Sequence, residues 1–202
     1  MRGLLSHPRV YSLFRRFVGR NSAREVYARE HLRLLPGQRV LDLGCGPGDI
    51  LQFLPEVQYV GYDISPAYVE RARRRFGHRG TFHCAAVDQV SPGTGFDVVI
   101  AHGVLHHLDD AAAATLFRVA RRALAPGGRL VSFDGCYSPD QSFLSRLVVS
   151  MDRGQHVRTR EAYEALARAE FDEVKSFLRH DLIRIPYTHL IMECGTAPPS
   201  RL

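Results

Sequence analysis

Residues 39–49 read RVLDLGCGPGD, a short apolar run that leads into a glycine-rich segment. This pattern predicts a buried strand, then a sharp turn, then a helix. Glycine suits such a turn because it has no Cβ, so the backbone can bend sharply and a ligand can approach it closely. The helix that follows points free N–H groups at whatever lies on the turn. Ligands of open α/β sheets bind at this place, so the segment predicts a site for a nucleotide-type cofactor.

The spacing of the glycines separates two classes of cofactor. A dinucleotide fingerprint has the form G-x-G-x-x-G, whereas Gly44, Gly46 and Gly48 are spaced G-x-G-x-G with Pro47 inside the loop. Asp63 supplies a carboxylate for ribose hydroxyls at the end of the next apolar run. Ribose is common to both classes, so the glycine spacing and the proline decide, and they argue against an NAD-dependent dehydrogenase.

Two later motifs follow the glycine loop in order. Residues 96–108 read FDVVIAHGVLHHL, and residues 124–130 read LAPGGRL. With VLDLGCGPG at 40–48, they make the chain resemble the class I (Rossmann-like) S-adenosylmethionine-dependent methyltransferases of the small-molecule type over roughly residues 22–195. The resemblance implies an α/β fold, a three-layer sandwich around a seven-stranded, mostly parallel sheet with an antiparallel last strand and a short helical cap insert.

One methyltransferase domain is expected over 1–202. Its expected parts are N-terminal helices (1–36), a cofactor-binding core (37–135), a substrate cap insert (136–170) and a C-terminal strand pair (171–195).

Strands and helices are expected to alternate, which implies right-handed parallel crossovers. After the first strand, further strands are expected at 58–64, 81–86, 96–101 and 129–134. Helices are expected at 22–35, from the glycine loop to about 54, at 66–77, 110–124, 141–151 and 159–169. Ser22, Ser65 and Asp110 are the predicted N-terminal caps. Two β-like runs, 171–178 and 189–194, are joined by about ten residues, which favours an antiparallel hairpin.

Composition is that of a globular protein: 45% of the 202 residues are hydrophobic and 24% are charged, enough for a substantial core. The sequence shows neither an apolar run that could span a bilayer nor a signal peptide, so a cytoplasmic location is expected. The basic, amphipathic stretch 1–20 is a candidate contact with a membrane surface. Four well-separated cysteines disfavour a disulfide or a zinc site. The net charge of +6, mostly from arginine, is interpreted as a solvated surface.

The resemblance also implies which residues bind S-adenosylmethionine and its product S-adenosylhomocysteine. Asp63 would hold the ribose and Ile64 would lie against the adenine. The family often has an acidic residue near the adenine where this chain has Ala86, which leaves Asp88 as its substitute. Tyr27 is predicted either to cover the cofactor or to pack in the core. The full cofactor set is Tyr27, Asp42, Gly44, Cys45, Gly46, Asp63, Ile64, Ala86, Val87, Ala101 and His102.

The acceptor is expected to meet side chains that overhang the strand ends. His106, Asp134 and His156, in that order, are the candidate bases if the acceptor must lose a proton. A structural role for His106, bonded to a neighbouring loop, is the alternative. Metal is not expected, because the chain lacks the H-E-x-x-H glutamate and a clear third ligand. The candidate substrate contacts are His106, Asp134, Arg153, His156, Arg158, Tyr187 and His189.

Several acceptors remain open at this point. A small molecule, a lipid-linked intermediate or a sugar suits a compact cap, with the methyl group going to oxygen, nitrogen or carbon. RNA is the first alternative, supported by the basic charge but disfavoured by the lack of an RNA-binding domain and of an N-P-P-Y-type motif. A non-catalytic module that binds S-adenosylmethionine is the second. The sequence leaves the oligomeric state open.

Overall fold

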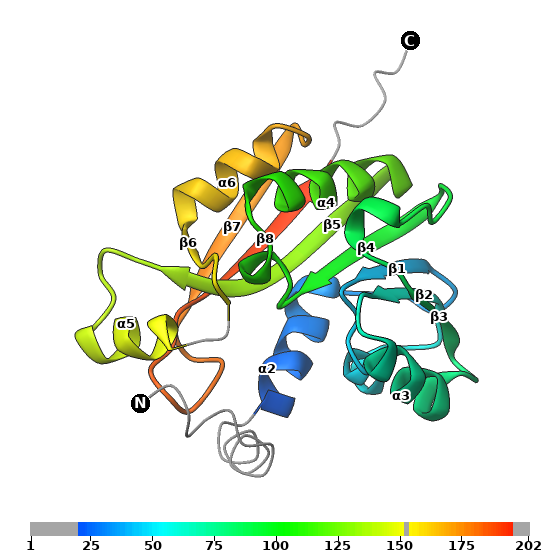
Figure 1. Ribbon diagram of the computed structural model, residues 1–202, viewed down its shortest axis with the longest axis horizontal. Coiled ribbons are helices and arrows are strands. Elements are labelled where there is room, and N and C mark those ends of the chain that lie inside the picture. Colours follow the sequence, from blue (N-terminus) through cyan, green and yellow to red (C-terminus); the bar gives the residue numbers. More distant parts are fainter. Residues whose placement is uncertain (1–19, 152–153, 196–202) are drawn as a thin grey trace.

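The computed structural model describes residues 20–151 and 154–195. Within these ranges the strands follow the order β3-β2-β1-β4-β5-β8-β7, and the two-residue β6 pairs with β5. Strand β8 runs antiparallel to both β5 and β7, while the other pairs are parallel. The expected mostly parallel sheet with an antiparallel last strand is therefore confirmed (Figure 1). The strands are β1 (Arg39–Leu43), β2 (Gln58–Asp63), β3 (Gly80–Cys84), β4 (Phe96–His102), β5 (Leu124–Tyr137), β6 (Arg158–Thr159), β7 (Glu173–Arg179) and β8 (His189–Gly195).

Helices cover both faces of this sheet (Figure 1). Strand β4 is mostly apolar and buried, and its side chains point alternately into two hydrophobic cores, one on each face of the sheet. Val98 and Ile100 pack with α2, η1 and α3, whereas Val99 and Ala101 pack with α4 and α6. The helices are α2 (Arg20–Val26), the π-helix η1 (Tyr27–Leu32), α3 (Pro66–Phe76), α4 (Asp110–Ala123), α5 (Phe143–Ser150) and α6 (Arg160–Arg168), with short 3-10 turns η2 (Asp49–Phe53), η3 (Val87–Gln89) and η4 (Leu105–His107).

The helix caps agree with the sequence in part. The hydroxyl of Ser65 accepts a hydrogen bond from the backbone N–H of Tyr68, ahead of the proline that begins α3. Asp109, rather than the expected Asp110, caps α4, because its carboxylate accepts the N–H of Ala112 at 2.9 Å. The predicted cap of α4 was thus displaced by one residue, and Ser22, predicted as the first cap, lies inside α2, which includes Arg20.

Three expected elements differ in form. The helix expected over 22–35 is α2 followed by a π-helix, whose wider turns bury Tyr27 and His31, and it ends at Leu32. The helix after the glycine loop is a 3-10 helix of five residues. The turn expected before the fifth strand lies inside β5, where the pairing jumps from Phe96 with Leu124 to Val98 with Arg129. No helix in the described ranges is long and apolar enough to cross a bilayer.

Candidate functional site

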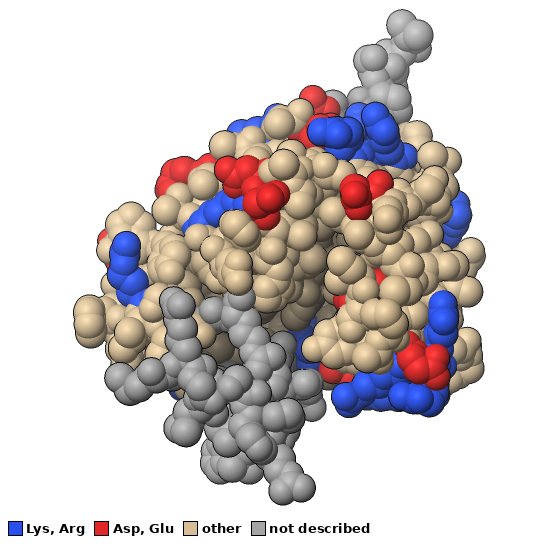
Figure 2. Space-filling model, in the orientation of Figure 1, with Lys and Arg blue, Asp and Glu red and all other residues tan. Residues whose placement is uncertain are grey.

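A cavity of about 1190 Å³ opens where the parallel strands β1, β2, β4 and β5 end. Its walls come from distant parts of the chain, from Ala23 on α2 to His189 on β8. Figure 2 shows the hollow on this face, with mostly uncharged side chains around it. Its position is the one expected for a ligand site in an open parallel sheet, and its volume is large enough for a cofactor together with an acceptor.

The glycine loop lines this cavity, and its glycines serve two purposes: one allows close packing, and the other leaves space for a ligand. Gly44 has φ +79°, and a Cβ there would approach Cγ2 of Val104 to 2.7 Å. Gly46 has φ +54°, but no atom lies within 4 Å of the place where its Cβ would be. Gly44 is therefore needed for packing, whereas Gly46 leaves open space on the cavity side. This space is a cradle in which a ligand can approach the main chain.

Asp63 connects the glycine loop to the start of α3. Its Oδ2 accepts the backbone N–H of Gly46 at 2.8 Å, and its Oδ1 accepts that of Ser65 at 2.8 Å. Each carboxylate oxygen has a second lone pair that can accept a hydroxyl proton. The next residue, Ile64, is 72% exposed although it is large and apolar, and it lines the cavity. An apolar side chain can lie against the base of a nucleoside, and a neighbouring carboxylate can accept hydrogen bonds from its ribose hydroxyl groups.

Asp42 lies beneath the loop and is fully buried. Burial raises the pKa of its carboxyl group to about 7. The hydroxyl of Tyr59 donates a hydrogen bond to Oδ2 at 2.6 Å, which lowers the pKa by a smaller amount. Its other oxygen, Oδ1, has no hydrogen-bond partner among the described residues. A buried acceptor that faces a cavity and lacks a partner is suited to a cationic or hydrogen-bonding group of a ligand.

His106 and Asp134 form a buried pair at the other end of the cavity. Oδ1 of Asp134 lies 2.8 Å from Nδ1 of His106 and 3.2 Å from the backbone nitrogen of the same residue. Burial raises the pKa of Asp134, while its hydrogen bonds with His106 oppose that rise. The same acid oxygen accepts the backbone N–H of His106, so it is placed to accept a proton carried on Nδ1, and in that tautomer Nε2 is the basic nitrogen.

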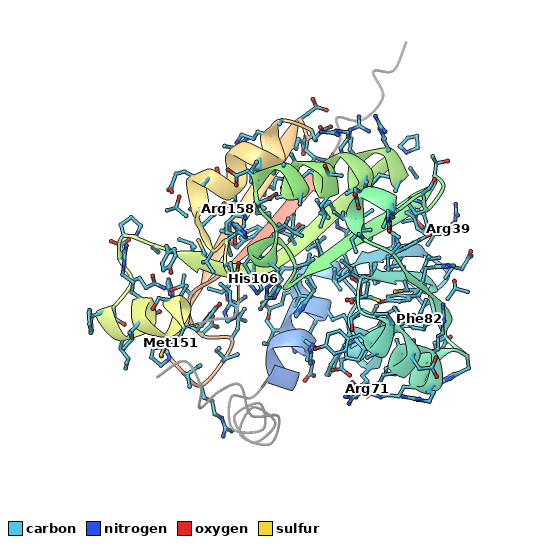
Figure 3. All side chains as sticks on the ribbon, viewed as in Figure 1. Arg39, Arg71, Phe82, His106, Met151 and Arg158 are labelled. Atoms are coloured by element: carbon cyan, nitrogen blue, oxygen red, sulfur yellow. The ribbon has the colours of Figure 1, made fainter. Side chains whose placement is uncertain are left out.

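The cap segment fixes the turn that carries His106. The N–H of His156 donates to the carbonyl oxygen of His106 at 3.0 Å, and a Cβ on Gly154 would approach the imidazole to 2.1 Å. Arg158 donates to the carbonyl oxygens of Leu105 and Leu108 at 3.1 and 2.7 Å. Figure 3 shows Arg158 and His106 on neighbouring segments. The predicted substrate residues His156 and Arg158 thus contact this turn and lie outside the cavity lining.

The cavity gathers most of the residues that the sequence singles out, but not all of them. Tyr27 is fully buried beneath it, with its hydroxyl donating to Val131 O at 2.8 Å, which agrees with the core-packing alternative. Ala101 is also buried outside the lining. Arg153 lies outside the described residues, as does most of the basic stretch 1–20. Those in the lining are Asp42, Gly44, Cys45, Gly46, Asp63, Ile64, Ala86, Val87, His102, His106, Asp134, Tyr187 and His189.

Other lining residues were missed from the sequence. Arg24 on α2 and Arg71 on α3 lie in the wall on the side of the glycine loop, and Val148 and Met151 form part of the opposite wall. Ile183 and Ile185 come from the turn between β7 and β8. For Val148 and Met151, the apolar spacing within 144–151 predicts an apolar helix face, but it does not indicate that this face borders the cavity.

Comparisons with known proteins agree with this geometry. A family model described as a methyltransferase domain matches residues 41–130. Phosphoethanolamine N-methyltransferase 1 of Arabidopsis thaliana is 28% identical over 201 residues, which cover 91% of this chain and 40% of that protein. The 27-O-demethylrifamycin SV methyltransferase of Amycolatopsis mediterranei is 37% identical over 122 residues, 56% of this chain and 44% of that protein. The chain thus spans less than half the length of these curated relatives.

A solved structure shares the fold. It is described as the S-adenosylmethionine-dependent methyltransferase SibL in its apo form, with a TM-score of 0.73 and 22% identity, and the match covers 96% of this chain and 61% of that one.

Proposed function

Because this chain belongs to the class I S-adenosylmethionine-dependent methyltransferases, we propose that it transfers the methyl group of that cofactor to a small-molecule acceptor. The observation that carries the proposal is one cavity that holds a nucleoside-type wall at Asp63 and a buried acid–histidine pair at Asp134 and His106. Bound S-adenosylmethionine supplies an activated methyl group on a sulfonium. The protein then has to position the acceptor and exclude water.

The residues present fit this cofactor. Asp63 is the proposed ribose contact and Ile64 the proposed adenine contact, with Ala86 and Val87 on the same side of the cavity. The open cradle at Gly46 and the buried oxygen of Asp42 suit the polar methionine portion. Asp88 also lines the cavity, and its carboxylate is the proposed replacement for the acid that the family often has near the adenine amino group.

His106 is the proposed general base. Asp134 holds the Nδ1 proton, so Nε2 accepts a proton from an acceptor hydroxyl or ammonium group as the methyl group is transferred. The carboxylate also stabilises the imidazolium that forms. His102 lies flat against Phe133, with ring centroids 4.6 Å apart, and both residues line the cavity.

The relatives differ in what they methylate, and a charged acceptor would be bound by oppositely charged side chains of the cavity. One is named for phosphoethanolamine and another for demethylrifamycin SV. A phosphate group is usually bound by arginine or lysine. Arg24 and Arg71, the two such residues in the described lining, come from α2 and α3, which flank the glycine loop and Asp63. The arginines of the described lining therefore lie on the cofactor side of the cavity.

Calorimetric titration with S-adenosylmethionine, S-adenosylhomocysteine and NAD tests the cofactor. We expect micromolar binding of both sulfur compounds and at least tenfold weaker binding in Asp63→Asn. The matched control is Glu70→Ala, which removes an exposed carboxylate paired with Arg74 on α3 and should bind normally. A preference for NAD, or no binding of either sulfur compound, would overturn the proposal. Methyl transfer is then sought with labelled S-adenosylmethionine, and binding without transfer to any acceptor would favour a non-catalytic module.

A further inference from the structure

Helix α5 carries an apolar stripe at the edge of the cavity. Leu144, Leu147, Val148 and Met151 follow the i, i+3, i+4, i+7 spacing that places side chains on one face of a helix. Exposed fractions of 56% for Leu144, 43% for Leu147 and 54% for Met151 show that much of this face meets solvent.

This stripe continues into the cavity. Val148 and Met151 line it, whereas Leu144 and Leu147 lie outside the lining. Figure 3 shows Met151 at the end of α5 and His106 next to β5. Ile183 and Ile185 add further apolar surface to the lining. One apolar track therefore begins in the cavity that holds His106 and ends on the outer surface of α5.

The base of α5 is held in place by a polar network. The side-chain amide of Gln141 donates to the hydroxyl groups of Ser145 and Thr188 at 3.1 and 2.9 Å and to the carbonyl oxygen of Cys136. These contacts join α5 to β5 and to the segment before β8. Because the helix is fixed on its inner side, its outward apolar face is a defined feature of the fold.

We infer that the acceptor is an amphiphile, whose polar reactive group lies beside His106 and whose apolar tail leaves the cavity over Val148 and Met151 and follows the stripe on α5. The inference rests on the proposed function and names its substrate class. The feature that favours a tail is the apolar surface of Val148, Met151, Ile183 and Ile185, which lines the cavity and continues onto α5. Burial of such a tail is favourable in proportion to the apolar area that it removes from water.

Calorimetric titration with the n-alkanols hexanol, octanol and decanol tests the tail site, with the full chain saturated by S-adenosylhomocysteine. We expect affinity to rise two- to fourfold for each added methylene, about fourfold being the limit for complete burial. The double variant Leu144→Ser/Leu147→Ser should weaken decanol binding about tenfold and change hexanol binding little. Leu35→Ser is the matched control, because Leu35 is 65% exposed and lies far along the chain from α5.

The outcomes separate the tail site from the cofactor assignment. Affinities that do not change with chain length, or that rise equally in the double variant, would overturn the inference, as would tight binding of phosphoethanolamine. If S-adenosylhomocysteine does not bind but the alkanol series, repeated on the protein alone, behaves as expected, the cofactor assignment fails and the apolar site stands. If S-adenosylhomocysteine binds and the alkanol series is flat, the tail site fails and the cofactor assignment stands.

Discussion

His106 is held by contacts at its ring and at its backbone. Asp134 fixes Nδ1, while the N–H of His156 and the Cα of Gly154 hold the peptide and the ring from the cap side. Such restraint is what a base requires, because proton transfer depends on a fixed distance and orientation. A purely structural histidine would gain little from lining the cavity.

Replacing His106 tests this role. We expect His106→Gln to lower kcat about 10²- to 10⁴-fold, the usual contribution of a general base. Binding of S-adenosylhomocysteine should change less than threefold, because the proposed cofactor contacts are elsewhere. Exposed His78, which lies outside the cavity lining, provides the control, His78→Gln, which should keep near-normal kcat. A fall in cofactor binding that matches the fall in kcat would instead indicate a structural role.

The protonation state of Asp42 affects the stability of the fold. Its pKa is about 7 in the folded protein and near 4 in the unfolded chain, so the folded state binds the extra proton between these values. The stability that this group contributes is therefore fully present below about pH 4 and is lost as the pH rises through 7.

Guanidinium unfolding of the wild type and of Asp42→Asn at pH 5, 6, 7 and 8 measures this effect. We expect the free energy of unfolding of the wild type, relative to the variant, to fall from pH 5 to pH 8. Asparagine cannot ionise but can still accept the hydrogen bond from Tyr59, so the comparison isolates the charge. Parallel pH profiles for the two proteins would contradict the assignment.

At the scale of elements, Arg158 connects β6 to the η4 turn. Its side chain is 8% exposed, and the guanidinium donates hydrogen bonds to backbone carbonyl groups of residues 105, 108 and 156. We expect Arg158→Met to lower the free energy of unfolding by about 3 kcal/mol, because buried acceptors lose their donor. Its ion-pair partner Asp110 is 81% exposed, so Asp110→Ala should cost less than about 1 kcal/mol. Denaturant unfolding distinguishes the two variants, and equal losses would contradict this account.

The sequence predicts those elements whose signals are local. The glycine loop, the strand that ends at Asp63 and the proline-started α3 depend on residues close together in the chain, and the structure agrees. Arg158, a predicted substrate contact, bonds to carbonyl groups about fifty residues away in the chain, and local patterns do not show such partners. Tyr27, at the start of the π-helix, donates its hydroxyl proton to Val131 O on β5, more than a hundred residues away in the chain. Contacts between residues that are far apart in the chain therefore could not be predicted from local sequence patterns.

For the whole molecule, the cavity walls unite segments that are distant in sequence. Ala23 on α2, the glycine loop, α5 and the segment before β8 all contribute, and together they span most of the described chain. A ligand bound there contacts walls from several elements at once, and it can bind in full only when those elements are in place. Ligand binding should therefore stabilise the fold as a unit rather than one element alone.

Thermal unfolding with S-adenosylhomocysteine measures this coupling. A ligand at 100 times its Kd adds about 2.7 kcal/mol to the free energy of unfolding. For a chain of this size, about 2–4 °C per kcal/mol gives an expected rise in Tm of about 5–10 °C. Asp63→Asn should show a rise of less than about 2 °C under the same conditions, while Glu70→Ala should behave as the wild type. An equal rise in Asp63→Asn would mean that Asp63 does not hold the ligand, because its carboxylate would then contribute nothing to the coupling between cavity and fold.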